Sequence, residues 1–312
     1  MNPAFRAFSF EIIDYAGLFP PARLPLDEAI RNYARYRTSP DAWMLSSFIA
    51  PASRLGELAS YRDELFVPSP TFAFSVLAGG GDEGAEYRSE LDEARGAIVS
   101  FRETCGPSVQ VNAHEVKLPA AAGDASAVRN AVAAARDVLS TERVFFEVPT
   151  GERWRARLDA AIEALSDVAG GIMGLKLRCG GLEPGDTPTV EIVAAAVAGC
   201  RDAGVPLKAT AGLHHPVRHH REDEGVTMHG FLNVFGAGIL ARACGLGARE
   251  ITGALAEQDA GAFRFERDGF SWREHTASIP EIEAARERAV VSFGSCSFDE
   301  PREDLRALGL LS

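Results

Sequence analysis

Short apolar segments alternate with helical segments over most of the chain, and this alternation limits the fold more than any other feature. The segments predicted as strands span 9–15, 42–50, 71–78, 109–118, 143–148, 172–177, 205–210 and 229–235. The segments predicted as helices span 25–37, 54–63, 83–104, 125–140, 154–168, 190–203 and 236–244. Strands that alternate with helices form parallel sheets with crossover helices. Eight strands favour a closed (β/α)8 barrel, a TIM barrel of the α/β class, over an open doubly wound sheet.

The barrel is expected to span residues 1–250, because the eight predicted strand–helix units end there. Residues 251–312 then form a C-terminal extension. A helix, a hairpin with an Asp268-Gly269 turn and a second helix at 280–289 are predicted within it. A segment of this length would have a small core of its own, so we expect it to pack on the barrel.

The composition excludes several classes of protein. The formal net charge is −12 and no basic stripe is present, which excludes nucleic acid as an expected partner. The five cysteines are odd in number and include no C-x-x-C pair, as in reduced thiols of a cytoplasmic protein. No signal peptide and no membrane-spanning run is apparent. We therefore expect an acidic cytoplasmic protein that does not bind membranes, and the sequence leaves a homo-oligomer open.

Lysine is rare in this chain, and its placement is informative. Three of the 32 basic residues are lysines, Lys117, Lys176 and Lys208, and the other 29 are arginines. Each lysine falls near the carboxyl end of a predicted strand and not on a helix surface. Arginine stays protonated, whereas a desolvated lysine can act as a nucleophile or base. The placement predicts a functional role for at least one lysine, although a biased composition would also explain the scarcity.

Charged side chains gather at the predicted strand ends. They are Asp14, Glu115, Lys117, Glu147, Lys176, Arg178 and Lys208. Residues two apart on a strand share a face, and barrel enzymes place their chemistry at the carboxyl ends of the strands. We therefore expect these groups to converge in one mouth. The alternative is an ion-pair network that has only a structural role.

Two lysines on adjacent strands suggest amine catalysis. A lysine must be neutral to attack a carbonyl, and a second ammonium group nearby lowers its pKa. Lys176 is the expected nucleophile, and Lys208 is expected to lower its pKa. Glu147 or Glu115 would transfer the protons. Arg178 would bind a substrate carboxylate or phosphate through its planar guanidinium.

Residues 171–212 resemble class I aldolases of the deoxyribose-phosphate aldolase type. In that family a lysine on the sixth strand forms the Schiff base, and a lysine on the seventh strand, in a segment like Lys-Ala-Ser-Gly-Gly, adjusts its reactivity. Lys176 lies on the predicted sixth strand, and Lys208 lies on the seventh in Lys-Ala-Thr-Ala-Gly. The resemblance implies a barrel lyase. Because Leu177-Arg178-Cys179 differ from the family's residues, it concerns the amine chemistry and not the substrate.

Histidines gather after the predicted seventh strand. Five of the seven, His214, His215, His219, His220 and His229, lie within sixteen residues. His214 or His215 is expected to be a general acid or base, or to donate a hydrogen bond to substrate. The alternative is a divalent metal such as zinc, held by His214, His215 and His229.

Three smaller candidates accompany these groups. Asp14 ends the first strand and is expected to reach the same mouth, and Asn233 on the predicted eighth strand is expected to contact substrate. Cys296 is interpreted as an inert buried thiol, because no histidine lies near it in sequence.

The sequence thus predicts a barrel enzyme that uses a strand-end lysine and no cofactor. Its substrate would be a small anionic carbonyl compound, a sugar phosphate or keto acid. One alternative is a metal-dependent hydrolase or lyase that uses the histidine loop. The other is a non-catalytic barrel that binds a small molecule.

Overall fold

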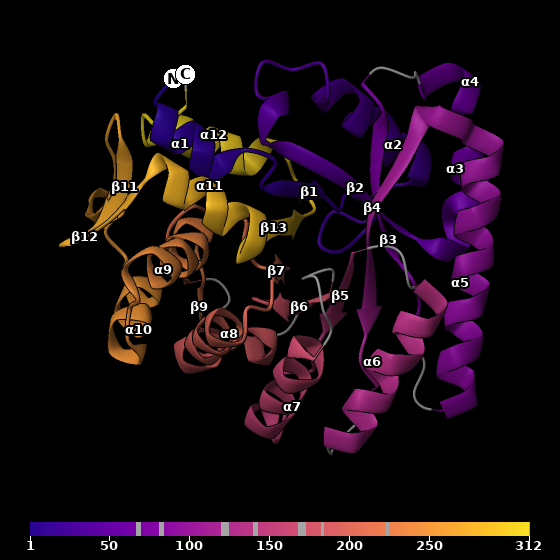
Figure 1. Ribbon diagram of the computed structural model, residues 1–312. Helices are drawn as coiled ribbons and strands as arrows, with labels where there is room; N and C mark the ends of the chain where they lie inside the picture. The colour runs from indigo at the N-terminus through magenta and orange to yellow at the C-terminus, as the bar shows by residue number, and fades with distance from the viewer. Residues whose placement is uncertain are drawn as a thin grey trace.

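Eight parallel strands form a closed barrel in the computed structural model (Figure 1). The structure describes residues 1–66, 70–80, 84–119, 125–139, 143–167, 173–181, 184–222 and 225–311. The barrel strands are β1 (Ile13–Tyr15), β2 (Leu45–Pro51), β3 (Phe72–Leu77), β4 (Val109–Lys117), β5 (Val144–Glu147), β6 (Met173–Arg178), β7 (Leu207–Thr210) and β13 (Val290–Ser295). Their order around the barrel is β1-β13-β7-β6-β5-β4-β3-β2. The predicted (β/α)8 fold is confirmed.

Helices follow the strands and surround the barrel (Figure 1). They are α2 (Leu26–Tyr36), α3 (Leu55–Ala59), α4 (Arg62–Leu65), α5 (Gly84–Cys105), α6 (Ala125–Leu139), α7 (Trp154–Ser166), α8 (Val190–Ala203), α9 (Phe231–Cys244), α10 (Ala248–Ala256), α11 (Ile279–Arg288) and α12 (Asp299–Ala307). In α2 the predicted stripe of Leu26, Ile30 and Tyr33 is buried against the core. Some predicted end residues, Glu83, Ser140, Val168 and Ile172, lie outside the described residues.

The expected eighth strand at 229–235 is wrong. His229 and Gly230 precede helix α9, which begins at Phe231. Every residue from 231 to 241 is buried, so this segment has no polar face. A short apolar run without periodicity does not distinguish a buried helix from a buried strand. Gly238 lets helix α9 pack closely on Val290, because a Cβ at position 238 would lie only 2.3 Å from Cγ1 of Val290.

The eighth strand is instead β13, which pairs with β7 on one side and β1 on the other. β13 lies beyond residue 250, so a barrel that ended at residue 250 would lack one strand. The segment expected to be an extension of the barrel therefore contains part of it. The predicted hairpin around Asp268-Gly269 is confirmed, because β10 (Phe263–Phe265) pairs antiparallel with β11 (Gly269–Trp272). β12 (His275–Ser278) extends this sheet, and β8 (His219–Arg221) pairs with β9 (Val226–Met228).

A short helix, α1 (Pro3–Ser9), precedes the first strand, so the predicted strand at 9–15 is confirmed only for 13–15. Asn2 caps the helix, because its Oδ1 accepts from the backbone N–H groups of Ala4 and Phe5 at 2.9 and 3.1 Å. Arg286 of α11 donates to the carbonyls of Phe8 and Phe10 at 2.8 and 3.0 Å. These contacts hold α1 against α11 at the amino-terminal end of the barrel. No helix among the described residues is long and apolar enough to cross a membrane.

Candidate active site

Polar side chains from the barrel strands contact one another, although branched apolar side chains usually fill such barrels. Each of the eight strands contributes at least one residue to a single connected network, which Ser47 joins through its backbone N–H. The members are Asp14, Ser47, Ser75, Asn112, Glu115, Glu147, Lys176, Arg178, Lys208 and Ser292. Buried polar networks are expensive unless every group has a partner. We therefore take this network as the candidate site.

Glu115 lies at the centre of the network and is 2% exposed. Its Oε1 lies 2.6 Å from Nζ of Lys208, and its Oε2 lies 2.8 Å from Nζ of Lys176. The Oγ of Ser75 donates to Oε1 at 2.6 Å. One carboxylate therefore joins both lysines, which are Cα partners on β6 and β7.

Asp14 holds the other side of Lys208, with its Oδ2 2.9 Å from Nζ. The backbone N–H of Ser47 donates to Oδ1 of Asp14 at 3.0 Å, and the hydroxyl of Ser292 donates to Oδ2. Lys208 Nζ also lies 3.2 Å from Oγ of Ser75. Asp14 was expected to reach the mouth of the barrel at the carboxyl ends of the strands. It lies instead in the middle of β1 and is buried.

Glu147 and Arg178 form the end of the network nearest the carboxyl ends of the strands. Glu147 Oε2 lies 2.8 Å from Nζ of Lys176, and Oε1 lies 3.5 Å from Nη1 of Arg178. The side chain of Arg178 is 42% exposed and that of Glu147 is 12% exposed. Charge thus alternates along the network as Asp14, Lys208, Glu115, Lys176, Glu147 and Arg178. Three carboxylates offset three cations.

This alternation favours the ionised forms of Glu115, Lys176 and Lys208. Burial opposes the charge on Glu115, but Lys176 and Lys208 outweigh it and hold the pKa of Glu115 well below its usual range. Burial likewise opposes the charge on Lys208, yet Asp14 and Glu115 raise its pKa to about 12. For Lys176 too, burial is outweighed by Glu115 and Glu147, and its pKa is raised. The expected lowering of the Lys176 pKa by Lys208 is therefore wrong, because a carboxylate separates the two amines.

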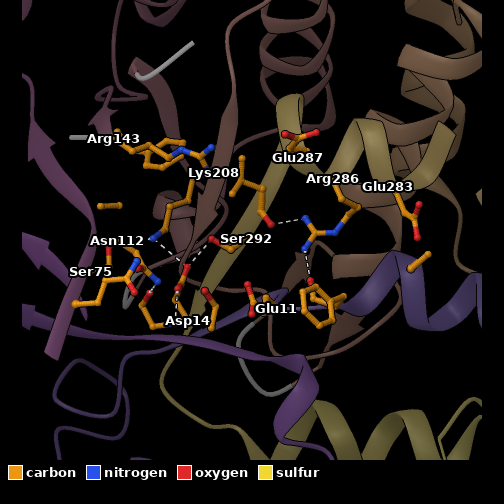
Figure 2. A pocket seen from close by; sticks show the side chains of 18 of the residues that line it. Glu11, Asp14, Ser75, Asn112, Arg143, Lys208, Glu283, Arg286, Glu287 and Ser292 are labelled. Atoms are coloured by element: carbon orange, nitrogen blue, oxygen red, sulfur yellow. Dashed lines mark hydrogen bonds and ion pairs between the residues drawn. The ribbon is translucent and has the colours of Figure 1, made fainter. Parts of the chain in front are cut away.

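A cavity of about 910 Å³ borders the Asp14 end of the network (Figure 2). Residues near the amino ends of the strands line it, including Ser46, Asn112 and Arg143, and α1 and α11 contribute further residues. Asp14, Ser75 and Lys208 face the cavity from the barrel, and Arg286 and Glu283 face it from α11 (Figure 2). Nothing in the sequence pattern had indicated a cavity at this end.

The predicted site residues fall into two groups. Six of the seven strand-end charges are in the network: Asp14, Glu115, Glu147, Lys176, Arg178 and Lys208. They form one chain of contacts that runs from the buried Asp14 to the partly exposed Arg178. Lys117 is exposed at the end of β4, outside the buried network.

Asn233 is also outside the network, because it lies on α9 and not on a strand. Its Oδ1 accepts from the N–H of Arg218 at 2.8 Å, and its Nδ2 donates to the carbonyls of Ala254 and Glu257 at 2.9 and 2.8 Å. The amide of Asn233 therefore bonds to three backbone groups of the protein. The structure gives no support to the expected contact with substrate.

The histidine loop contacts α12 instead of the network. His214 Nδ1 lies 2.7 Å from Oε2 of Glu300, and His215 Nδ1 lies 2.6 Å from Oδ2 of Asp304. The Nε2 of His229 bonds to the carbonyl of Pro188 at 2.8 Å. The shortest contact of each histidine is to a different residue, and no described group of three His, Cys, Asp or Glu side chains is arranged to hold a metal ion.

The serines of the network were missed by the sequence analysis. Ser75 interrupts Phe-Ala-Phe-Ser-Val-Leu, and Ser292 interrupts Val-Val-Ser-Phe. A lone hydroxyl in an otherwise apolar strand is the signal that could have found them. Cys296, interpreted from the sequence as an inert buried thiol, is only partly buried, and its Sγ lies 4.0 Å from Nε2 of His214.

No family model and no curated protein matches this chain.

Proposed function

We propose that the barrel is a lyase that forms a Schiff base between Lys176 and a small carbonyl compound. The observation that carries the proposal is the contact of one carboxylate, Glu115, with the Nζ atoms of Lys176 and Lys208 at 2.8 and 2.6 Å. Two desolvated amines joined by one carboxylate, with a second carboxylate, Glu147, beside Lys176, are parts that amine catalysis can use. Their positions on the sixth and seventh strands agree with the resemblance to class I aldolases.

Lys176 is the better nucleophile of the two. Lys208 is held by Asp14, Glu115 and Ser75, whereas Lys176 is held by Glu115 and Glu147. Glu147 is partly exposed, so it can exchange a proton with solvent. Arg178 lies beside Glu147 and is exposed enough to bind an anionic group of the substrate.

The first step requires Lys176 to lose a proton, because both lysines are ammonium groups at rest. Glu147 accepts that proton, and the nitrogen lone pair attacks the carbonyl carbon. The carbonyl oxygen takes one proton from the amine and one from Glu147 and leaves as water, which produces the iminium ion. The bond between the α and β carbons then breaks and its electrons move into the iminium to give an enamine, while the β-hydroxyl loses its proton to Glu147 and the β fragment leaves as a carbonyl compound. Glu147 returns the proton to the enamine carbon, and water hydrolyses the resulting iminium and restores the ammonium group of Lys176. Lys208 stays charged and supports Glu115 throughout.

Borohydride trapping tests this proposal. The protein is incubated with pools of small aldehydes, keto acids and phosphorylated sugars, reduced, and mapped by mass spectrometry. We expect one adduct on Lys176 and none on the exposed Lys117, which serves as an internal control. The variant Lys176→Arg keeps a cation between Glu115 and Glu147 and should fold but form no adduct. No adduct from any pool, or adducts on Lys117 alone, would refute the proposal.

The cavity next to Asp14 and Lys208 favours a second candidate, a barrel that binds a small polar molecule without a reaction. Its volume of about 910 Å³ suits such a ligand, and groups of both signs line it, among them Glu11, Arg143 and Glu287. Ligand-induced thermal shifts that disappear in Arg143→Ala, with no borohydride adduct, would favour this function over the lyase.

A further inference from the structure

We propose that Cys296, His214 and Glu300 form a thiol nucleophile site at the carboxyl-terminal end of the barrel, which accepts an acyl group from an ester or thioester. Cys296 directly follows β13, and His214 lies in the loop after β7. Glu300 is in the first turn of α12. The site uses none of the lysines, so it is independent of the proposed lyase.

The three side chains have the order of nucleophile, base and orienting carboxylate. Sγ of Cys296 lies 4.0 Å from Nε2 of His214, and Nδ1 of the same ring lies 2.7 Å from Oε2 of Glu300. A hydrogen bond from Nδ1–H to Glu300 leaves Nε2 available to receive the thiol proton. Contacts between a nucleophile and its base are often longer before substrate binds, so the 4.0 Å separation fits this role.

The surroundings of His214 favour its charged form. Burial opposes the charge, but contacts with Cys296 and Glu300 raise the pKa of His214 to about 9. A protonated imidazole beside a thiol stabilises the thiolate, which is the reactive form of cysteine. Glu300 also lies 3.9 Å from Nε2 of His215, and His215 is held by Asp304 at 2.6 Å. The carboxylate is thus fixed from two sides.

The other cysteines provide a contrast. Cys105, Cys179 and Cys200 are buried, and burial raises the pKa of each thiol. Cys244 is exposed, but its Sγ donates to the carbonyl of Thr276 at 3.3 Å, and partial burial raises its pKa as well. In the described part of the chain, Cys296 is the cysteine whose sulfur contacts a histidine.

The position in the barrel also supports a reactive site. Enzymes with this fold place their chemistry at the carboxyl ends of the strands, and Cys296 and His214 both follow barrel strands at that end. Cys296 is neither buried nor fully exposed.

The reaction balances without a cofactor. His214 in its charged form holds the thiol proton at Nε2, and Sγ attacks the carbonyl carbon of the ester or thioester. The carbon–oxygen or carbon–sulfur bond breaks, and His214 returns the proton to the leaving alcohol or thiol. An acyl group is then joined to Cys296 through a new thioester. Water, deprotonated by His214, attacks this thioester, releases the acid and restores the thiol.

The first test compares two cysteines in one protein. The protein is treated with limiting iodoacetamide at pH 6 to 9, and alkylation of Cys296 and Cys244 is measured by peptide mapping. At pH 6 we expect Cys296 to react at least roughly tenfold faster than the more exposed Cys244, because the imidazole of His214 lies 4.0 Å from its sulfur. The variants His214→Gln and Glu300→Gln should remove this advantage and leave the rate at Cys244 unchanged. Equal rates at the two cysteines, or an unchanged rate in His214→Gln, would overturn the proposal.

The second test addresses the acyl group. With p-nitrophenyl acetate we expect a burst of nitrophenol and one acetyl group on Cys296, both absent in Cys296→Ser. Fast alkylation without acetylation would overturn the proposed substrate class. Glu300 is about half exposed, so Glu300→Gln is the variant least liable to disturb folding, and circular dichroism of each variant identifies any that fail to fold. Neither test depends on borohydride trapping, so failure here leaves the lyase proposal unaffected, and the reverse also holds.

Discussion

The Nζ atom of Lys208 lies 2.9 Å from Oδ2 of Asp14, and both side chains are 2% exposed. Neither group would be tolerated alone at this position, because a buried charge without a partner costs several kcal/mol. Among the described residues, Lys208 is the cation that contacts Asp14, whereas Glu147 contacts two cations, Lys176 and Arg178. The two lysines should therefore differ in how much stability depends on them.

Lys208→Met should reduce the free energy of unfolding by about 3–5 kcal/mol, because Asp14 is left buried without its cation. Lys176→Met should cost less, about 1–3 kcal/mol, since Glu115 keeps Lys208 and Glu147 keeps Arg178. Lys117→Met is the matched control, and a change within about 0.5 kcal/mol is expected at this exposed site. Urea denaturation measures all three, and equal costs for Lys176 and Lys208 would contradict the described network.

The network should make the protein sensitive to acid. The pKa values of Glu115 and Glu147 are lowered in the folded state, so their contribution is present above the unfolded pKa of about 4.3 and is lost as pH falls below it. The pKa of Lys208 is raised to about 12, so its contribution is complete below pH of about 10 and is lost above that. The contribution of the network to the unfolding free energy should be flat from about pH 5 to 10 and fall at both ends.

Glu115→Gln distinguishes this explanation from general acid denaturation. The variant should be less stable at pH 7, and its stability should depend less on pH below about 4, because one carboxylate with a lowered pKa is gone. Denaturation curves at pH 7, 4.5 and 3 supply the comparison. An acid dependence as steep as that of the wild type would count against the assignment.

His214 should titrate near pH 9, above the usual range for histidine. Burial opposes its charge, but Cys296 and Glu300 outweigh that effect. Its contribution to stability should be complete below pH of about 6.5 and be lost as pH rises through about 9. NMR titration of the ring protons measures this value directly. In Glu300→Gln the pKa should decrease, and an unchanged value would mean that the carboxylate does not hold the imidazolium.

Arg286→Ala should destabilise the protein by about 2–4 kcal/mol, because its buried guanidinium donates to the carbonyls of Phe8, Phe10, Val290 and Val291. These bonds join α1, α11 and β13. Hydrogen exchange should accelerate in α1 before the rest of the barrel. Arg288→Ala, in the same helix with a side chain 74% exposed, should change stability by less than about 0.5 kcal/mol. Equal effects of the two substitutions would exclude this structural role.

The sequence predicted the parts of the fold that local patterns specify. Seven barrel strands, the hairpin at Asp268-Gly269 and most helices follow from periodicity and turn residues. The eighth strand was not predicted correctly. Phe231–Ala241 is more apolar than Val290–Ser295, and because it is buried on all sides it lacks the periodicity that identifies a helix. Which of two apolar segments closes a barrel depends on contacts made across the whole chain, and no local pattern records them.

The charged residues of the candidate site were predicted from the scarcity of lysine, but their arrangement was not. The alternation of side chains along a strand predicts which face of the sheet a side chain lies on. It does not predict the position of that side chain along the barrel axis, because the strands are tilted. The position of Glu115 between Lys176 and Lys208 was therefore not expected. Sequence distance also explains why Cys296 was interpreted as inert. Its partner His214 is 82 residues away in the chain, and the interpretation considered only residues near Cys296 in sequence.

The closure of the barrel by β13 has a consequence for synthesis of the protein. From Leu207 at the start of β7 to Ser295 at the end of β13 the chain advances 88 residues (295 − 207). At about 5–20 residues per second, a ribosome needs roughly 4–18 s to make that segment. During this interval the edges of β1 and β7 have no strand between them, and Asp14 and Lys208 sit at those open edges. Open strand edges promote association with other chains, so the nascent protein has a period of risk that ends only when its last strand is inserted.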